Sequence, residues 1–350
     1  MTTVERLDAR LRGYHGQDLT AVLDVLDYLI DVDGDEATVI AGGSLSIEQG
    51  NRESDLDVVI VAEGVPSSAV PVEHWVGSLR IDAWTRTPAD VEALFVRAEA
   101  ALAADSPIRG AFGDVVQEQE LKLLHRIAFG VVVRGSTVRP EASPDVSSTA
   151  LRLLSREYTE RARESVTVAA LALAAGRDLL AATVARVGVE EALHAQLHGR
   201  GVPFSGDKWL SEQLREQPDL AAVHAQVAVL PSRGEPLTAY TEAALESAHR
   251  LLGVPPEAVL AGLCWTFAGL RVLPLAGGHL LVCVAHGAAW HLEEAEAAVW
   301  QALCGGAERG GFPHPADAAG AALCVRWYEA GLLAPDWDRG LRPVAWAPVA

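Results

Sequence analysis

Hydrophobic and polar residues follow three different patterns along this chain. In residues 1–145, short apolar runs lie between amphipathic segments, which predicts strands mixed with helices. Residues 146–255 have helical periodicity almost throughout, and residues 256–350 return to strands followed by two helices. The pattern therefore predicts an α+β fold in three parts: a small mixed sheet with flanking helices, a helical bundle and a small C-terminal domain of strands and helices.

The first part contains the clearest individual elements. Strands are expected at Thr38–Ala41, at Leu56–Val61 and in Ser78–Arg86, where apolar and polar residues alternate. Helices are expected at Val4–Leu11, Leu19–Ile30, Pro88–Ala103 and Val115–Arg126. The segment Thr137–Ser148 carries two prolines and several small polar residues, and it is interpreted as a linker to the helical part.

Three aspartates lie on the predicted strands. Asp55 and Asp57 are two residues apart at the start of an apolar run, so both carboxylates project from one face of the strand, about 7 Å apart. Two such charges repel each other unless a cation lies between them, and Mg²⁺ takes one or two protein carboxylates together with phosphate oxygens and water. If Ser78–Arg86 pairs with the same strand, Asp82 joins them, and two metal ions can clamp an in-line displacement.

A glycine turn precedes the acids. Gly42 and Gly43 follow the strand Thr38–Ala41, and glycine permits both a tight turn and a close approach of the backbone to a ligand. Ser44 is expected to begin a short helix, whose first amides suit a phosphate group. The chain has no Gly-Lys-Ser/Thr sequence and no glycine triplet after a strand, which excludes a Walker A loop and a Rossmann fingerprint.

In this order, Gly43-Ser44, Asp55-Leu56-Asp57 and Asp82 resemble the pattern of the DNA-polymerase-β-like nucleotidyltransferase superfamily, and NRESDLD looks like its small antibiotic nucleotidyltransferases. The resemblance implies that Ser44 contacts phosphate, that Asp55 and Asp57 bind metal, and that Asp82 binds a second metal or acts as the base. It also implies that the cofactor is Mg²⁺, with two ions expected, and that the substrate is a nucleoside triphosphate, with ATP expected first. We expect the acceptor hydroxyl to belong to a small secondary metabolite or to a peptide.

The helical part offers two further candidates for the same site. Lys208, one of two lysines in the chain, lies in SGDKWL, which is similar to Lys-Trp segments of the superfamily whose lysine reaches the triphosphate. The alternative is a surface lysine beside a core tryptophan. Arg177-Asp178 is expected at the start of a helix. It is expected either to face the substrate cleft or to form a surface ion pair.

Histidines on the predicted helices have simpler interpretations. His194 and His198 have the i, i+4 spacing of a helical metal pair, but no glutamate follows the first and no third ligand is evident. We therefore expect both to be exposed helix residues. Lys122 and His125 are likewise expected on a helix surface.

The C-terminal part is expected to contain a strand pair, Leu280–Val284 and Ala288–Leu292, then helices Glu293–Leu303 and Ala316–Gly331. The segment AAWHLEEAEAAVWQALCGG, with VRWYEAGLL after it, resembles the PqqD-like winged-helix module, although Glu296 and Trp327 depart from its pattern. The resemblance implies that a peptide binds by strand addition. The alternative is that these leucines and aromatic residues simply form a core.

Composition limits the partners. The formal net charge of −19 argues against a nucleic-acid-binding surface, because phosphate backbones are held by Lys and Arg. No run of eighteen apolar residues is present, so neither a membrane span nor a signal peptide is expected. Four cysteines in apolar settings, without a Cys-x-x-Cys pair, indicate reduced buried thiols in a cytoplasmic protein. The oligomeric state stays open, as does a degenerate, non-catalytic nucleotide-binding role.

Overall fold

The structure is a computed structural model of the chain. It describes residues 1–30, 37–47, 50–68, 70–103, 116, 118–138, 140, 141, 143, 145–203, 209–232, 234–253, 264–267, 270–275, 278–283, 288–307, 318–330 and 333–336. The chain forms two compact units. The first comprises Met1–Ala104, Val116–Leu154 and Gly201–Ser205, and the second comprises Asp105–Val115, Ser155–Arg200 and Gly206–Ala350. The division into three domains stays a prediction.

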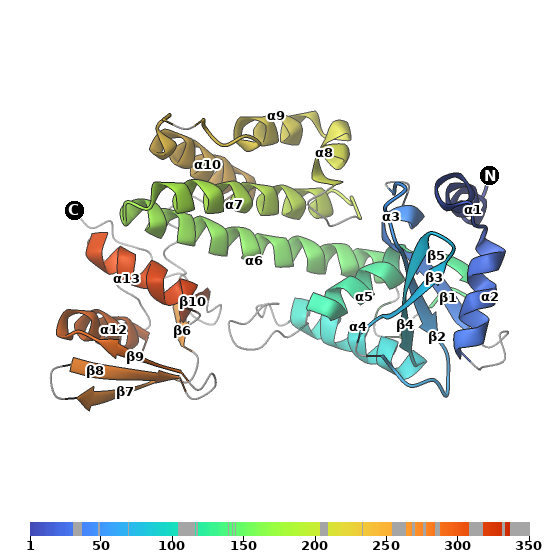
Figure 1. Cartoon of the computed structure of the whole chain (residues 1–350), viewed down its shortest axis with the longest axis horizontal. Coiled ribbons are helices and arrows are strands. Elements are labelled where there is room, and N and C mark those ends of the chain that lie inside the picture. Colours follow the sequence, from blue (N-terminus) through green and yellow to red (C-terminus); the bar gives the residue numbers. More distant parts are fainter. Residues whose placement is uncertain are drawn as a thin grey trace. The chain divides into compact units, whose positions relative to one another are not determined.

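A five-stranded mixed sheet forms the centre of the first unit (Figure 1). Its strands, in spatial order, are β3 (Val72–Val76), β4 (Leu79–Arg86), β2 (Leu56–Val61), β1 (Thr38–Gly42) and β5 (Val131–Arg134). The β2–β4 pair is parallel and the other pairs are antiparallel. The α+β class and the pairing of the two acid-bearing strands are therefore confirmed.

Strand alternation gives this sheet two different faces. Leu56, Val58 and Ile60 of β2 point to one side, where Leu79, Ile81 and Ala83 of β4 join them in a buried core with residues of α1 (Thr3–His15) and α2 (Leu19–Ile30). Successive side chains of a strand point to opposite faces. The odd-numbered residues of β2 and the even-numbered residues of β4 therefore lie on the other side, and these include Asp57 and Asp82.

Helices on that second side complete the unit. Helix α5 (Glu118–Phe129) packs there against β1 and β2, with α4 (Pro88–Ala103) beside it. The short helix α3 (Gly43–Ser46) follows β1 directly, and its Leu45 belongs to the core on the first side. The bounds predicted for α2 and α4 match the observed bounds at both ends. Helix α5 begins and ends three residues later than predicted. The expected linker also ends earlier, because α6 (Val146–Ala174) already begins at Val146.

Long antiparallel helices dominate the first half of the second unit (Figure 1). After α6 come α7 (Asp178–Gly199), α8 (Leu210–Gln213), a 3-10 turn (Leu214–Glu216), α9 (Pro218–Val227) and α10 (Leu237–Leu252). Gly188 lies inside α7. An added Cβ there would lie 3.2 Å from the Cβ atom of Ser165, so this glycine allows α7 to approach α6 closely.

The rest of the second unit contains small sheets and two helices. Strands β7 (Leu270–Leu275), β8 (Gly278–Cys283) and β9 (Ala288–Leu292) form an antiparallel sheet, and β6 (Cys264–Phe267) pairs with β10 (Leu333–Asp336). Helices α12 (Glu294–Ala307) and α13 (Ala318–Glu329) accompany them. The β8–β9 pair and both helices were expected from the sequence; β6, β7 and β10 were not.

Aromatic side chains of this region are core residues, as one of the two interpretations held. The Trp300 and Trp327 rings meet edge to face with centroids 5.0 Å apart, and both are buried. They share a core with Leu171 of α6 and Ala181 of α7. Cys324 is a buried free thiol, and burial raises the pKa of this group to about 12. The winged-helix module stays a prediction.

Among the helices that the structure describes, none combines the length and the hydrophobicity needed to cross a membrane.

Candidate functional site

The acids lie in two neighbouring rows on the face of the first unit's sheet against which α5 packs. In the first row, Asp57 of β2 pairs in register with Asp82 of β4, and Asp82 pairs with Glu73 of β3. Gly42 of β1 completes this row on the other side of Asp57. Neighbouring strands are about 4.8 Å apart. The strand register therefore brings together residues that are up to 40 positions apart in the sequence.

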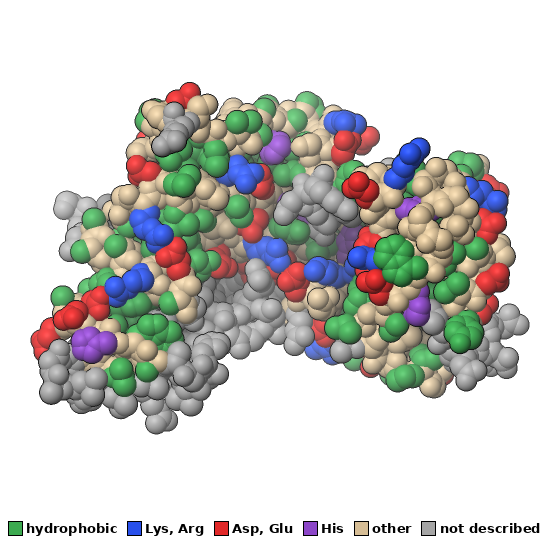
Figure 2. All heavy atoms as spheres, viewed as in Figure 1, with side chains coloured by type: hydrophobic (Ala, Val, Ile, Leu, Met, Phe, Trp, Pro, Cys, Tyr) green, Lys and Arg blue, Asp and Glu red, His purple; other side chains and the backbone are tan. Residues whose placement is uncertain are grey.

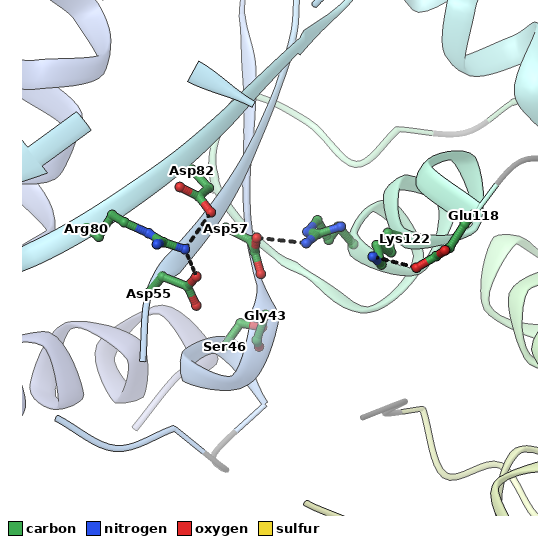
Figure 3. Close-up of polar contacts among 9 residues, drawn as sticks. Gly43, Ser46, Asp55, Asp57, Arg80, Asp82, Glu118 and Lys122 are labelled. Carbon is green, nitrogen blue, oxygen red and sulfur yellow. Dashed lines mark hydrogen bonds and ion pairs between the residues drawn. The ribbon is translucent and has the colours of Figure 1, made fainter. Parts of the chain in front are cut away.

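Arg80 of the second row links its neighbour Asp55 to Asp82 of the first row. One of its terminal nitrogens donates to Asp55 Oδ2 at 2.6 Å and to Asp82 Oδ2 at 3.0 Å (Figure 3). Trp75 of β3 lies opposite Arg80 in the ladder. The Asp82 side chain is 15% exposed, and those of Asp55 and Arg80 are 35% and 39% exposed, so this row faces solvent.

Arg126 of α5 neutralises the third acid. Its Nη2 atom donates to Asp57 Oδ1 at 2.8 Å, and its guanidinium stacks over the Trp84 ring at 4.2 Å from the centroid. The side chains of Asp57 and Arg126 are 13% and 14% exposed. Such a largely buried, charge-assisted hydrogen bond holds the Asp57 carboxylate in a defined orientation.

The glycine turn lies directly against Asp57. Gly43 has φ 75°, which is left-handed backbone, and a Cβ atom added to it would lie 2.4 Å from Asp57 Oδ2. Only glycine leaves this space open. Ser44 follows inside α3 and is buried, and Ser46 Oγ donates to the Gly43 carbonyl at 2.8 Å (Figure 3). The turn therefore begins α3 one residue earlier than expected.

The loop before β2 is fixed by its own side chains. Asn51 Oδ1 accepts from the Glu53 amide at 2.9 Å, and Ser54 Oγ accepts from the Asn51 amide at 2.9 Å. Ser54 is only 2% exposed. Side chains that bond to the nearby backbone hold a turn in one conformation. The NRESDLD segment thus holds Asp55 directly before the first residue of β2.

Burial dominates the protonation of Asp57 and Asp82 in the first row. Desolvation raises the pKa of Asp57 above its ordinary value, against the opposing effect of Arg126. Desolvation also raises the pKa of Asp82, with Arg80 opposing and the charge of Asp55 contributing. Both carboxylates are therefore less stable as anions here than in water. A cation or a proton at this place is favoured.

These residues can be tested against the magnesium ions that the superfamily resemblance implies. Carboxylate oxygens are the hard donors that Mg²⁺ prefers, and Gly43 keeps space free beside Asp57. The three acids exceed the two guanidinium groups by one charge. Among the described residues, however, no three Asp, Glu, His or Cys side chains are arranged to hold a metal. The residues fit a divalent cation in donor type and charge, provided that Arg80 releases one of its carboxylates.

The other expected site residues have different outcomes. Lys208 lies outside the described residues, so its contact with a triphosphate stays a prediction. Arg177 pairs with Glu329 at 2.7 Å, and both side chains are more than 40% exposed, which confirms the surface ion pair. Lys122 is exposed as expected and pairs with Glu118 at 2.8 Å.

The expected exposure of the histidines was wrong. His125 is buried on the inner side of α5, and its Nε2–H donates to the Pro203 carbonyl. Burial lowers the pKa of this imidazole to about 4. His194 and His198 are buried too, with ring centroids 4.8 and 5.4 Å from that of Tyr158 in α6. They pack between helices α6 and α7, a position that i, i+4 spacing cannot reveal.

Three residues around the acids, Arg126, Glu73 and Trp75, were not predicted from the sequence. Arg126 is 69 positions from Asp57, and nothing in the α5 sequence marks it as an acid partner. Glu73 and Trp75 lie on β3, a strand that was not predicted. The alternation in VEHWV before the Gly77 turn was the one available signal for this strand.

Comparisons with known proteins add little to this geometry. No protein-family model and no curated protein matches the chain. Among solved structures, it is similar to a nucleotidyltransferase-like protein from Exiguobacterium sibiricum 255-15, with 14% identity and a TM-score of 0.30. The match covers 67% of this chain and 74% of the other. At that level of similarity neither fold nor activity is carried over, and the function must be argued from the site.

Proposed function

We propose that this protein is a metal-dependent nucleotidyltransferase, which moves a nucleoside monophosphate from a nucleoside triphosphate to a hydroxyl group and releases pyrophosphate. The observation that carries the proposal is the in-register Asp57–Asp82 pair, with Asp55 beside it and the Gly43 turn against Asp57. Three carboxylates at one place on a sheet are costly unless they hold a cation. A glycine turn beside them lets the backbone approach a ligand closely.

Each acid has a role in the proposed reaction. Asp55 and Asp57 would hold Mg²⁺, which neutralises the triphosphate and stabilises the charge that develops on transfer. Asp82 is the candidate base, because its raised pKa suits it to accept the proton of the attacking hydroxyl. The hydroxyl oxygen then forms a bond to the α-phosphorus while the bond to the bridging oxygen of pyrophosphate breaks. All three residues mainly position and stabilise charge.

The nucleotide would lie on the β1 side of the acids. There the Gly43 turn meets Asp57, and the backbone of Gly42 and Gly43 can approach the phosphates because neither residue has a side chain. We include Ser44 and Lys208 as further phosphate contacts on the superfamily resemblance, and ATP as the first nucleotide to test. Arg126 keeps Asp57 oriented through their 2.8 Å hydrogen bond.

Removal of one acid charge tests the proposal. In Asp57→Asn, pyrophosphate release from ATP and Mg²⁺ should fall at least a hundredfold, or roughly 2.7 kcal/mol in the barrier. Asp27→Asn is the matched control, because Asp27 is also paired with an arginine, Arg134, but lies on α2 away from the acids. Both variants should keep their far-UV circular dichroism. Near-normal pyrophosphate release by Asp57→Asn would exclude these acids as the active site. The proposal would also be excluded if the unmodified protein released no pyrophosphate from any of the four common nucleoside triphosphates.

A further inference from the structure

We propose that Glu73 and Trp75 of the edge strand β3 form the acceptor subsite, and that the acceptor is a hydroxyl-bearing ring that is neutral or positively charged. This inference rests on the proposed nucleotidyl transfer, because it uses the direction in which the reaction must run. It adds two residues that no motif of the chain indicates. It also restricts the chemical class of the acceptor, which the acids alone leave open.

Strand register places both residues on the face that carries the acids. Glu73 pairs with Asp82, and Trp75 pairs with Arg80. Alternation along β3 turns Glu73 and Trp75 to that face, whereas Val76 belongs to the core on the opposite face. The first row therefore runs Gly42, Asp57, Asp82, Glu73, and the second row ends Asp55, Arg80, Trp75.

The direction of transfer selects the β3 end of these rows for the acceptor. In an in-line displacement the attacking and leaving oxygens lie on opposite sides of the phosphorus. If the pyrophosphate lies at the Gly43 turn on the β1 side, the attacking hydroxyl must arrive from the other side of Asp57. The next residue on that side is Asp82, the candidate base, and the residue after it is Glu73.

Trp75 has the surface that a ring acceptor needs. Its side chain is 60% exposed, and indole is a large group that soluble proteins usually bury. Its Nε1–H donates to Glu73 Oε1 at 3.1 Å, so the indole is oriented by the neighbouring residue of the same face. A ring with an apolar face can stack on this indole while its hydroxyl groups donate to Glu73. Figure 2 shows hydrophobic, acidic and basic side chains side by side on this unit.

Charge decides which rings are accepted. With Glu73 included, the two rows and Arg126 contain two more carboxylates than guanidinium groups. The charge of Glu73 is felt at the site, since it helps to raise the pKa of Asp82. A phosphorylated or carboxylated acceptor would be repelled here, whereas hydroxyl and ammonium donors are attracted. The acceptor is therefore not a nucleic acid or an acidic peptide.

Saturation-transfer NMR on the full chain tests the subsite with three ring probes: methyl glucoside, glucosamine and glucose 6-phosphate. The two uncharged or cationic rings should receive saturation from the protein, and glucose 6-phosphate at most a third as much. In Trp75→Ala the signals of the first two should fall at least fivefold, and Trp75→Phe should retain at least half. Tyr28→Ala is the matched control, because Tyr28 is an aromatic residue of the same unit that is 88% exposed on α2. It should behave like the unmodified protein.

Several outcomes would overturn the inference. The inference is wrong if no ring probe receives saturation, or if the signals are equal in Trp75→Ala and the unmodified protein. It is also wrong if glucose 6-phosphate gives the strongest signal, or if a serine-containing peptide displaces the rings. The proposed function is tested separately, by pyrophosphate release to water in the absence of acceptor. Tyr28→Ala should keep that release within twofold, whereas Asp57→Asn should lose it. A negative result in the ring-binding test therefore does not contradict the proposed nucleotidyl transfer. A negative result in the pyrophosphate test contradicts the transfer without involving any acceptor.

Discussion

The substitution Gly43→Ala tests the tightest packing in the site. Gly43 has φ 75°, and an alanine in left-handed backbone costs about 1–2 kcal/mol. The added Cβ would also lie 2.4 Å from Asp57 Oδ2, a distance that real Cβ contacts do not show, so the carboxylate must move. Movement of Asp57 weakens its 2.8 Å hydrogen bond to Arg126, and a bond between largely buried charged groups contributes roughly 1.5–3 kcal/mol. Gly43→Ala should therefore lose about 2.5–5 kcal/mol of the free energy of unfolding, the sum of these two contributions.

Gly16→Ala separates the two contributions. Gly16 ends α1 with φ 67°, and a Cβ atom there would meet nothing within 4 Å. This control should therefore lose only the backbone contribution of about 1–2 kcal/mol. Pulse proteolysis in urea, with peptides of Met1–Ala104 followed by mass spectrometry, reports the first unit apart from the second. The difference between the two variants is the free energy of the contact with Asp57.

Binding measurements complete this test. Displacement of Asp57 should weaken Mg²⁺-dependent ATP binding at least tenfold, or about 1.4 kcal/mol, in calorimetric titration of Gly43→Ala. Gly16→Ala should bind as the unmodified protein does. If both variants lose equal stability and both keep normal nucleotide affinity, Gly43 is an ordinary turn residue and its contact with Asp57 does not shape the site.

Two further predictions concern cations and pH. Arg80→Gln leaves Asp55 and Asp82 without their shared guanidinium, so Mn²⁺ affinity measured by electron paramagnetic resonance without nucleotide should rise at least threefold. Arg97→Gln, which breaks the surface pair with Glu120, should not change it; equal affinities in both variants would contradict the competition. His125 has a pKa lowered to about 4 in the fold from 6.5, so the unfolded chain binds its proton first as pH falls. Stability should therefore drop between pH 6.5 and 4, by about 3 kcal/mol at most, and this drop should disappear in His125→Gln.

Local patterns in the sequence determined the elements that carry the site. The alternation LRIDAWTR predicts β4, because a strand buried on one face alternates apolar and polar residues. The apolar run LDVVIV predicts β2, because a strand buried on both faces is apolar almost throughout. Two glycines between a strand and a helix predict the turn, and Asp55 and Asp57 share a face by strand geometry alone. Their combination with Asp82 required one assumption, the pairing of the two strands, which the parallel β2–β4 register confirms.

Only the tertiary structure decided what surrounds each acid. Arg126 reaches Asp57 because α5 packs on β1 and β2, and Arg80 lies between Asp55 and Asp82 because strand register sets them side by side. Helix packing likewise buried His194 and His198, which spacing alone left as exposed residues. Residue type and spacing describe one element at a time, whereas burial, charge pairing and pKa depend on the neighbours that packing brings from distant parts of the chain.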